Sequence, residues 1–183
     1  MFRDRTVVLA VSAGIAAYKS ATIVRELKAA DAEVLVIMTK SATEFITALT
    51  FETLSQNPVA INIFSRNNRW NLEHIALADR ADLLLVAPAT ANIIGKAASG
   101  IADDLVSTTV LTMMSNVPIL MAPAMNTRMW DNPVVRKNVE MLKGVGVSFV
   151  GPEDGKLADG RIGTGRMSEV ADILKAAGQL ISR

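Results

Sequence analysis

The sequence contains no cysteine, only one histidine (His74) and no large surplus of either charge. Without cysteine, disulfides, zinc–thiolate sites, iron–sulfur clusters and a cysteine nucleophile are all excluded. The formal net charge is +1 and no long basic run occurs, so we expect neither a nucleic acid nor a membrane as a partner. No apolar run reaches the roughly 18 residues that a membrane span requires. We also expect no metal site.

What the chain does contain is typical of a globular domain. Its 183 residues are 50% hydrophobic and 20% charged, which suits a single domain over residues 1–183 with a substantial core. The first five residues lead directly into a strand-like segment, so no signal peptide is visible. These features predict a cytoplasmic protein.

Short apolar runs alternate with segments of helical periodicity. The runs at 6–11, 33–38, 83–87 and 118–122 predict buried strands, and 147–150 is a shorter candidate. Helices are predicted over 15–30, 73–80, 93–98, 104–113, 134–144 and 168–181. In the first helix we expect Ile15 and Tyr18 on the buried side. The alternation predicts an α/β fold with a single doubly wound parallel sheet, Rossmann-like (flavodoxin-like). Seven of the eleven glycines lie within 144–165, which predicts a long loop.

The first strand–turn–helix unit predicts an anion site. In the segment 11–17, VSAGIAA, free backbone N–H groups and the positive end of the helix dipole would face a ligand. The segment lacks the G-x-G-x-x-G spacing of dinucleotide folds, and the second strand ends in Thr39, Lys40 and Ser41 rather than an acidic residue. This pattern favours a mononucleotide phosphate, with flavin mononucleotide (FMN) ahead of a dinucleotide. The alternative is that the small residues only turn the chain.

Two further strands end in polar loops. One carries Thr90 and Asn92, and the other carries Asn126 and Trp130. Locally, Thr90 and Asn126 are equally suited to cap the helices that follow them, and Trp130 to pack in the core. All three loops are expected at one edge of the sheet, where ligands bind in such folds.

In this context the sequence resembles the homo-oligomeric flavin-containing cysteine decarboxylases, in particular the branch that acts on 4′-phosphopantothenoylcysteine in coenzyme A biosynthesis. The resemblance runs from about residue 6 to residue 167. It is carried by the opening segment 12–19, Glu73-His74-Ile75, and the segments 87–92 (APATAN), 100–105 (GIADDL), 123–126 (PAMN) with Met129-Trp130, and 163–167 (GTGRM).

The resemblance implies bound FMN and assigns roles to individual residues. Cofactor-binding residues would be Ser12, Gly14, Ile15, Thr39, Ser41, Ala89, Thr90, Asn92 and Ser107. His74 would be the catalytic histidine, and Asn126 would bind the substrate carboxylate beside Met129. It also implies a homo-oligomer, a trimer or a dodecamer, with the flavin at a subunit boundary, and a synthetase that is fused or separate.

His74 can also be judged from its surroundings in the sequence. A single histidine on a helix is usually a surface or structural residue. We expect Leu72, Ile75 and Ala76 to belong to the buried stripe of this helix, with His74 at its border, where it would face a neighbouring subunit. Imidazole, with an ordinary pKa of about 6.5, suits proton transfer near neutrality.

The implied chemistry explains the need for a flavin. Oxidation of the cysteine CH2–SH group to a thioaldehyde places a C=S bond β to the carboxylate, so that CO2 leaves with its electrons stabilised as an enethiolate. Reduction of that product then gives phosphopantetheine. The cofactor supplies the redox chemistry, and the protein supplies binding, orientation and proton transfer.

The sequence departs from the family in the late glycine-rich segment. Many members have Ala-Cys-Gly there, whose cysteine donates a proton during the reduction, whereas this chain has Ala158-Asp159-Gly160. Asp159, with an ordinary pKa of about 4, would be mostly ionised at neutral pH. Another group then donates the proton, or the reduction is impaired. Otherwise the chain resembles the peptidyl-cysteine decarboxylases, which stop at the enethiol.

Two further kinds of protein share the fold and remain open as functions. One is a flavin prenyltransferase, and the other is a regulatory flavoprotein without catalysis.

Within the glycine-rich segment, Lys156, Arg161 and Arg166 are candidates for contact with the substrate phosphate.

Overall fold

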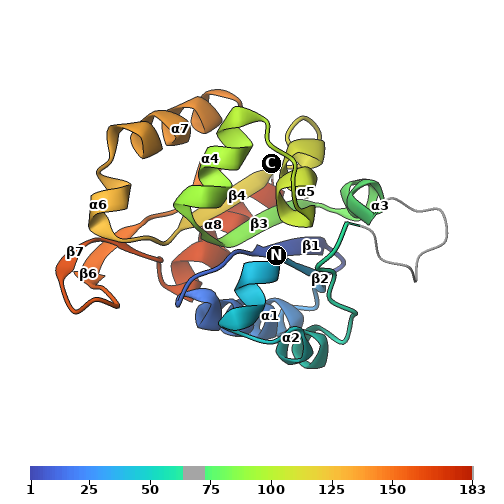
Figure 1. Cartoon of the computed structure of the whole chain (residues 1–183). Helices are drawn as coiled ribbons and strands as arrows, with labels where there is room; N and C mark the ends of the chain where they lie inside the picture. The colour runs from blue at the N-terminus through green and yellow to red at the C-terminus, as the bar shows by residue number, and fades with distance from the viewer. Residues whose placement is uncertain (64–72, 183) are drawn as a thin grey trace.

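A five-stranded parallel sheet forms the centre of the structure, a computed structural model that describes residues 1–63 and 73–182. The strands lie in the order β2-β1-β3-β4-β5, so the chain builds one side of the sheet and then crosses back to build the other (Figure 1). The strands are β1 (Thr6–Val11), β2 (Glu33–Met38), β3 (Leu83–Ala89), β4 (Ile119–Pro123) and β5 (Ser148–Phe149).

Helices cover both faces of the sheet, which makes it doubly wound. One face packs against α1 (Ala17–Ala29), α2 (Ala48–Ser55) and α8 (Val170–Ile181). The other packs against α3 (Glu73–Arg80), α4 (Ala91–Ser99), α5 (Leu105–Met113) and α7 (Pro133–Gly144). The short helices η1 (Lys40–Glu44) and α6 (Thr127–Trp130) follow β2 and β4. Figure 1 shows α1 and α2 below the sheet and α4, α5 and α7 above it.

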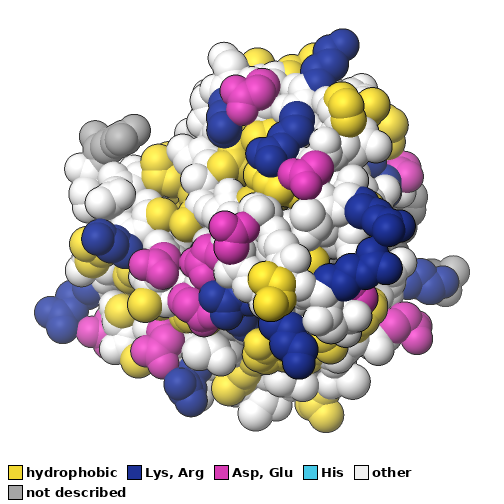
Figure 2. All heavy atoms as spheres, turned by 90° about the vertical axis from the view of Figure 1, so that its left-hand side faces the viewer, with side chains coloured by type: hydrophobic (Ala, Val, Ile, Leu, Met, Phe, Trp, Pro, Cys, Tyr) yellow, Lys and Arg dark blue, Asp and Glu magenta, His cyan; other side chains and the backbone are white. Residues whose placement is uncertain are grey.

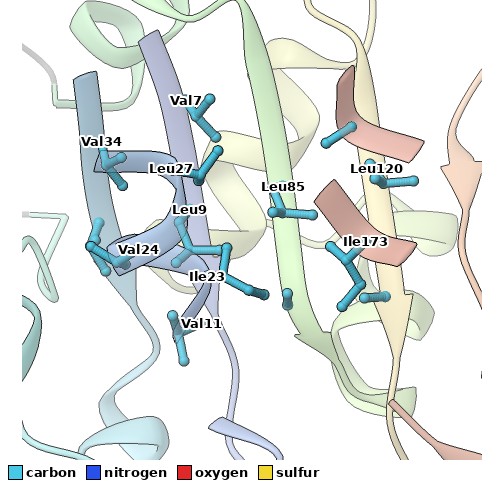
Figure 3. Close-up of a cluster of buried hydrophobic side chains, with 14 of the residues drawn as sticks. Val7, Leu9, Val11, Ile23, Val24, Leu27, Val34, Leu85, Leu120 and Ile173 are labelled. Atoms are coloured by element: carbon cyan, nitrogen blue, oxygen red, sulfur yellow. The ribbon is translucent and has the colours of Figure 1, made fainter. Parts of the chain in front are cut away.

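The strands have nearly continuous apolar sequences because both of their faces are buried. In β1, Leu9 and Val11 point toward α1, where Leu9 lies beside Ile23 (Figure 3). The alternate residues Val8 and Ala10 belong to the apolar cluster on the opposite face. All five side chains are fully buried. This burial fixes the register of the sheet, because a slip by one residue would exchange the two faces.

The strand predictions are confirmed. Strands β1 and β2 coincide with the predicted ranges, and the bounds of the other three strands agree to within two residues. Each predicted helix is present, although α1 begins at Ala17 rather than at Ile15. None of the helices in the described ranges is long and apolar enough to span a lipid bilayer.

Two expectations about local structure are wrong. The predicted loop over 144–165 contains β5 and most of an antiparallel hairpin, formed by β6 (Glu153–Lys156) and β7 (Ile162–Arg166). The expected burial of Ile15 and Tyr18 is also wrong, because their side chains are 61% and 62% exposed. Ile15 lies in the turn before α1, and the buried side of the helix is set by Ile23 and its neighbours Ala17, Ser20, Val24 and Leu27.

The core predicts the effect of a truncation in the central strand. We expect Leu85→Ala, whose side chain is fully buried in β3, to lower the free energy of unfolding by about 2–5 kcal/mol because it leaves a cavity. Leu49→Ala is the matched control, since that side chain is 69% exposed, and should change the free energy by less than about 1 kcal/mol. Urea unfolding measures both. Equal losses would contradict the assignment of the core.

Candidate functional site

A pocket of about 1000 Å3 opens at the carboxyl edge of the sheet, beside β1 and β3, where the strand order reverses. Ligands bind at such a crevice in doubly wound folds. The walls come from the segments that follow β1, β2, β3 and β4 and from the β6–β7 hairpin. Figure 1 shows α6 and the hairpin on this side, which Figure 2 views face on, with basic and acidic side chains around apolar patches. The volume suits a small organic ligand.

Ser12 joins the loop after β1 to the loop after β3. Its hydroxyl lies 2.7 Å from the Pro88 carbonyl oxygen, to which it donates, and 3.1 Å from the Thr90 hydroxyl. The Thr90 N–H donates to Ser12 Oγ over 3.3 Å. From α1, the buried Ser20 hydroxyl donates to the Ala87 carbonyl oxygen over 2.7 Å. These bonds fix the two strand ends, so the floor of the pocket is formed before any ligand binds.

The turn between β1 and α1 is suited to an anion. The N–H groups of Gly14, Ile15 and Ala16 donate to no backbone acceptor in the described ranges, and no side chain caps the start of α1. Because these three residues line the pocket, the positive end of the helix dipole lies beside it. Thr39 N–H donates to the Val11 carbonyl oxygen over 3.0 Å, which keeps the segment 39–41 beside this turn. That segment also lines the pocket and adds two hydroxyls and an ammonium group.

Asn126 combines a structural and a pocket-facing contact. Its side-chain oxygen accepts from Arg128 N–H over 2.9 Å and so caps α6. Because the oxygen is used in the cap, the amide nitrogen faces away from the helix, and it donates to Asp159 Oδ2 over 2.7 Å. The other oxygen of Asp159 accepts from Arg161 N–H over 3.0 Å. Both Asn126 and Asp159 line the pocket.

Strand β7 approaches the Asn126 loop so closely that two of its positions have no room for a side chain. A Cβ atom on Gly165 would overlap the Met125 carbonyl oxygen, and one on Gly163 would lie 2.5 Å from Thr127 Oγ1. Met125 N–H donates to the Gly165 carbonyl oxygen over 3.0 Å. The glycines that suggested a loop therefore serve close packing, and they hold the hairpin against the loop that carries Asn126.

Lys96, another residue that lines the pocket, forms ion pairs with two aspartates. Lys96 Nζ is 2.6 Å from Asp103 Oδ1 and 2.7 Å from Asp104 Oδ2. Desolvation opposes the charge of Lys96, but the hydrogen bonds to Asp103 and Asp104 outweigh it and raise the pKa of Lys96. The hydrogen bond from Lys96 lowers the pKa of Asp103. Lys96 and Asp104 both line the pocket, so they contribute an ion pair to its wall.

Most of the predicted site residues meet in this pocket. They are Ser12, Gly14, Ile15, Thr39, Ser41, Thr90, Asn92, Asn126, Met129, Asp159 and Arg166. The purely local capping and packing roles hold only in part. Thr90 occupies the N-cap position of α4 without a capping bond from its side chain. Asn126 caps α6 and also faces the pocket, and Trp130 is buried and packs beneath the Arg136 guanidinium.

Four predicted residues lie outside the lining: His74, Ala89, Ser107 and Arg161. Ala89 is fully buried at the end of β3. Ser107 is fully buried in α5, where its hydroxyl accepts from Asp104 N–H over 3.1 Å in a reciprocal cap. Arg161 is an exposed residue of the hairpin turn. The packing thus gives Ser107 a structural task that a motif match does not reveal.

His74 is placed far from Asn126 in the fold. It lies on α3, which Figure 1 shows at the side of the molecule opposite the β6–β7 hairpin. Its side chain is half-buried, and Nδ1 is buried without a hydrogen-bond partner in the described ranges. The expected burial of Ile75 is wrong, since that side chain is 45% exposed and Leu77 is buried instead. Leu72 lies outside the described residues.

The cationic side chains of the pocket differ in whether a carboxylate already pairs with them. The Arg166 guanidinium is 2.9 Å from Glu153 and 2.9 Å from Glu169, so its charge is already compensated. Lys156 and Lys40 line the pocket and make no ion pair within 1–63 and 73–182. These two lysines are therefore better suited than Arg166 to meet an anionic ligand.

The sequence did not identify several lining residues. Tyr18, Lys19, Lys96, Asp104 and Glu169 belong to the pocket, although none of them was predicted as a site residue. Lys19 Nζ donates to the Met167 carbonyl oxygen over 3.0 Å and pairs with Glu169. Tyr18 and Lys19 lie in the segment 12–19 and Asp104 lies in the segment 100–105, and both segments carry the family resemblance, but no role was assigned to these three residues. Lys96 and Glu169 come from distant segments that only the fold brings together.

Comparison with known proteins gives consistent matches over the whole chain. The profile of the family described as Flavoprotein matches residues 1–182. A coenzyme A biosynthesis bifunctional protein CoaBC from Bacillus subtilis is 46% identical over 177 residues, which are 97% of this chain but 43% of that protein. A probable phosphopantothenoylcysteine decarboxylase from Streptococcus mutans is 40% identical over 171 residues, 93% of this chain and 96% of that protein. The chain thus spans less than half of the bifunctional relative.

Solved structures show the same fold. A PPC decarboxylase cysteine-to-serine mutant complexed with pantothenoylaminoethenethiol matches with a TM-score of 0.87 at 30% identity, covering 99% of this chain and 100% of that one. The FMN binding protein AtHal3 matches with a TM-score of 0.83 at 31% identity, covering 97% of this chain and 96% of that one. These matches confirm the predicted Rossmann-like sheet.

The packing of β7 yields a prediction that does not depend on any ligand. We expect Gly165→Ala to cost about 1–3 kcal/mol of unfolding free energy, because the new methyl group must push β7 away from Met125. Exchange of the Met125 amide hydrogen, followed by NMR, should accelerate. Gly144→Ala is the control, since nothing lies within 4 Å of its Cβ position. Unchanged protection of the Met125 amide would contradict the docking of the hairpin.

Proposed function

The chain belongs to the Flavoprotein family, and on that premise we propose that it is an FMN-dependent decarboxylase that converts 4′-phosphopantothenoylcysteine to 4′-phosphopantetheine in coenzyme A biosynthesis. The observation that carries this proposal is the Asn126 amide group. It projects from the loop after β4 into a pocket at the strand switch point, and it already donates to a carboxylate.

The residues of the pocket fit FMN. The N–H groups of Gly14, Ile15 and Ala16 are free of backbone acceptors in the described part of the chain, and together with the hydroxyl and ammonium groups of the segment 39–41 they suit the single phosphate of FMN. The loop of Thr90 and Asn92 offers uncharged hydrogen-bonding groups and apolar surface to the remainder of the cofactor. When bound, FMN supplies the two-electron oxidation of the cysteine side chain and the later reduction of the decarboxylated product.

The chain's own residues would bind and orient the substrate. The Asn126 amide would hold the substrate carboxylate through a neutral donor, which fixes the C–C bond without strongly stabilising the anion before CO2 leaves. Lys156 would meet the substrate phosphate, a role for which Arg166 is less suited because Glu153 and Glu169 already compensate it. Lys40 and Lys156 each form no ion pair with a carboxylate in the described ranges.

His74 would supply proton transfer from another copy of the chain. It does not line the pocket that contains Asn126, and it lies on a helix at the far side of the molecule. A site that needs both groups must therefore be assembled from two chains, which supports a homo-oligomer, a trimer or a dodecamer. We further propose a cytoplasmic enzyme that works with a fused or separate synthetase, and the second activity of the relative that is named bifunctional leaves room for such a partner.

A second candidate activity rests on Asp159. Its carboxylate stands at the position where many family members have the cysteine that donates a proton in the final reduction. A chain that stops at the enethiol would still release CO2. It would leave a product two hydrogens short of phosphopantetheine.

Mass spectrometry distinguishes the candidates. We expect the purified protein to be yellow and, with 4′-phosphopantothenoylcysteine, to release CO2 and form a product about 44 mass units lighter. A loss of about 46 mass units would indicate arrest at the enethiol. Absence of CO2 would contradict decarboxylation and favour a prenyltransferase or a regulatory flavoprotein. A colourless protein that does not take up FMN would overturn the proposal as a whole.

Mixed oligomers test the origin of His74. His74→Asn and Asn126→Ala should each bind FMN and release little or no CO2 when expressed alone. Co-expressed in equal amounts with different tags, they should give about a quarter of the wild-type activity, because one of four random neighbour pairs joins an intact Asn126 to an intact His74. A mixture as inactive as its components would show that one chain does not complement the other.

A further inference from the structure

The contact between Asn126 and Asp159 has the chemistry of the contact that the proposed function requires between Asn126 and its substrate. In both, the side-chain amide donates to a carboxylate oxygen. In the structure that oxygen is Asp159 Oδ2, at 2.7 Å. A short bond to an ionised acceptor is among the stronger hydrogen bonds in proteins. The chain thus provides its own carboxylate at the group that would recognise a carboxylate substrate.

Two features direct the Asn126 donor toward the hairpin. The Asn126 oxygen is bound to Arg128 N–H in the cap of α6, so the amide cannot turn over without losing that cap. The base of the hairpin is held by the close packing of Gly163 and Gly165 against the same loop. Asp159 is therefore delivered to Asn126 by the fold.

The tip of the hairpin, which carries Asp159, is exposed and is closed by its own hydrogen bonds. Leu157 N–H donates to the Arg161 carbonyl oxygen over 2.8 Å, and Gly160 N–H donates to the Leu157 carbonyl oxygen over 2.9 Å, which closes the turn on itself. The residues 158–162 are exposed. Asp159 lies outside the ladder of β6 and β7, so its side chain can turn away from Asn126 without breaking a ladder hydrogen bond.

Two carboxylates do not share one amide without cost. Like charges within a few ångströms of one another disfavour the ionised state of both groups. The Asn126 nitrogen carries two hydrogens, but a ligand carboxylate bound to either of them would lie within a few ångströms of the Asp159 carboxylate. The approach of a ligand carboxylate therefore favours the departure of Asp159, whereas a ligand without a carboxylate leaves the contact intact.

We propose that Asp159 is a specificity-determining residue that competes with the substrate carboxylate for the Asn126 amide. This inference rests on the proposed function, because it takes a carboxylate at Asn126 as the substrate group. Asp159 lowers the affinity for the carboxylate-bearing substrate, and its hydrogen bond with the Asn126 amide forms again once CO2 has left. The decarboxylated product, which cannot compete, is released without resistance from Asn126.

Binding of two unreactive ligands to the FMN-loaded protein tests the proposal. The first, 4′-phosphopantothenoyl-alanine, has the carboxylate but no thiol, and the second, the corresponding N-ethylamide, has neither. We expect Asp159→Ala to bind the first ligand about five- to tenfold more tightly, because a hydrogen bond to an ionised group no longer has to be broken. The affinity for the second should change by less than about twofold. Isothermal titration calorimetry measures both.

Three further variants separate competition from a general effect of the hairpin. Asp159→Asn keeps a neutral acceptor and should give an intermediate gain. Asp154→Ala removes another hairpin carboxylate, which accepts from the Thr164 hydroxyl rather than from Asn126, and should leave the ratio of the two affinities unchanged. In an Asn126→Ala background, Asp159→Ala should no longer alter this ratio, because the amide over which the two carboxylates compete is gone.

The outcomes are distinct. An unchanged ratio in Asp159→Ala, an equal gain for both ligands, or the same gain in Asp154→Ala would overturn the competition while leaving the proposed function intact. If neither ligand binds to the wild type or to any variant, the proposed function fails, and the competition fails with it. NMR of the Asn126 side-chain amide reports its contact with Asp159 in each case, because the downfield proton shift of the bonded donor should be lost in Asp159→Ala.

Discussion

Two buried serine hydroxyls hold the carboxyl ends of the central strands together, and the site depends on them. Ser12 bonds to the Pro88 carbonyl oxygen and Ser20 to the Ala87 carbonyl oxygen, so the loops after β1 and β3 share one set of hydrogen bonds. Because these bonds are shielded from water, breaking one would leave a buried polar atom without a partner. The turn before α1 lies beside these bonds and lines the pocket, and the N–H groups of Gly14, Ile15 and Ala16 donate to no backbone acceptor within 1–63 and 73–182.

The fold could be predicted from the sequence wherever burial alone decides the structure. Strands β1 and β2 are covered on both faces, and their apolar runs mark their ends without error. The expected burial was wrong for Ile15 and Tyr18, whose apolar spacing is that of a helix core although both side chains are exposed and line the pocket. For Ile15, the family resemblance had already indicated a place in the cofactor site. The prediction from the sequence also failed at β7, because glycine indicates both a flexible loop and a strand that must pack closely against a neighbouring loop.

The site was predictable where each residue follows the end of a strand, because parallel topology places all such positions at one edge. Asn126, Thr90 and Ser12 come together for this reason. The partnership of Asn126 with Asp159 was not predictable, since it joins a loop to a hairpin tip 33 positions away, and a hairpin was not expected there. The separation of His74 from the pocket is likewise a property of the fold. The role proposed for His74 therefore depends on how copies of the chain assemble.

The contact between β7 and the loop of Asn126 depends on a backbone hydrogen bond and on two glycines of β7, and the exposed residues at the tip of the hairpin take no part in it. The base of the hairpin is therefore fixed in place, whereas an exposed residue at its tip can be exchanged for another. A single replacement at the tip can present a thiol, a carboxylate or an amide to the same spot without disturbing the β ladder beneath. In such an architecture new reactivity can arise by exchange of one exposed residue, and the scaffold that aims it is inherited unchanged.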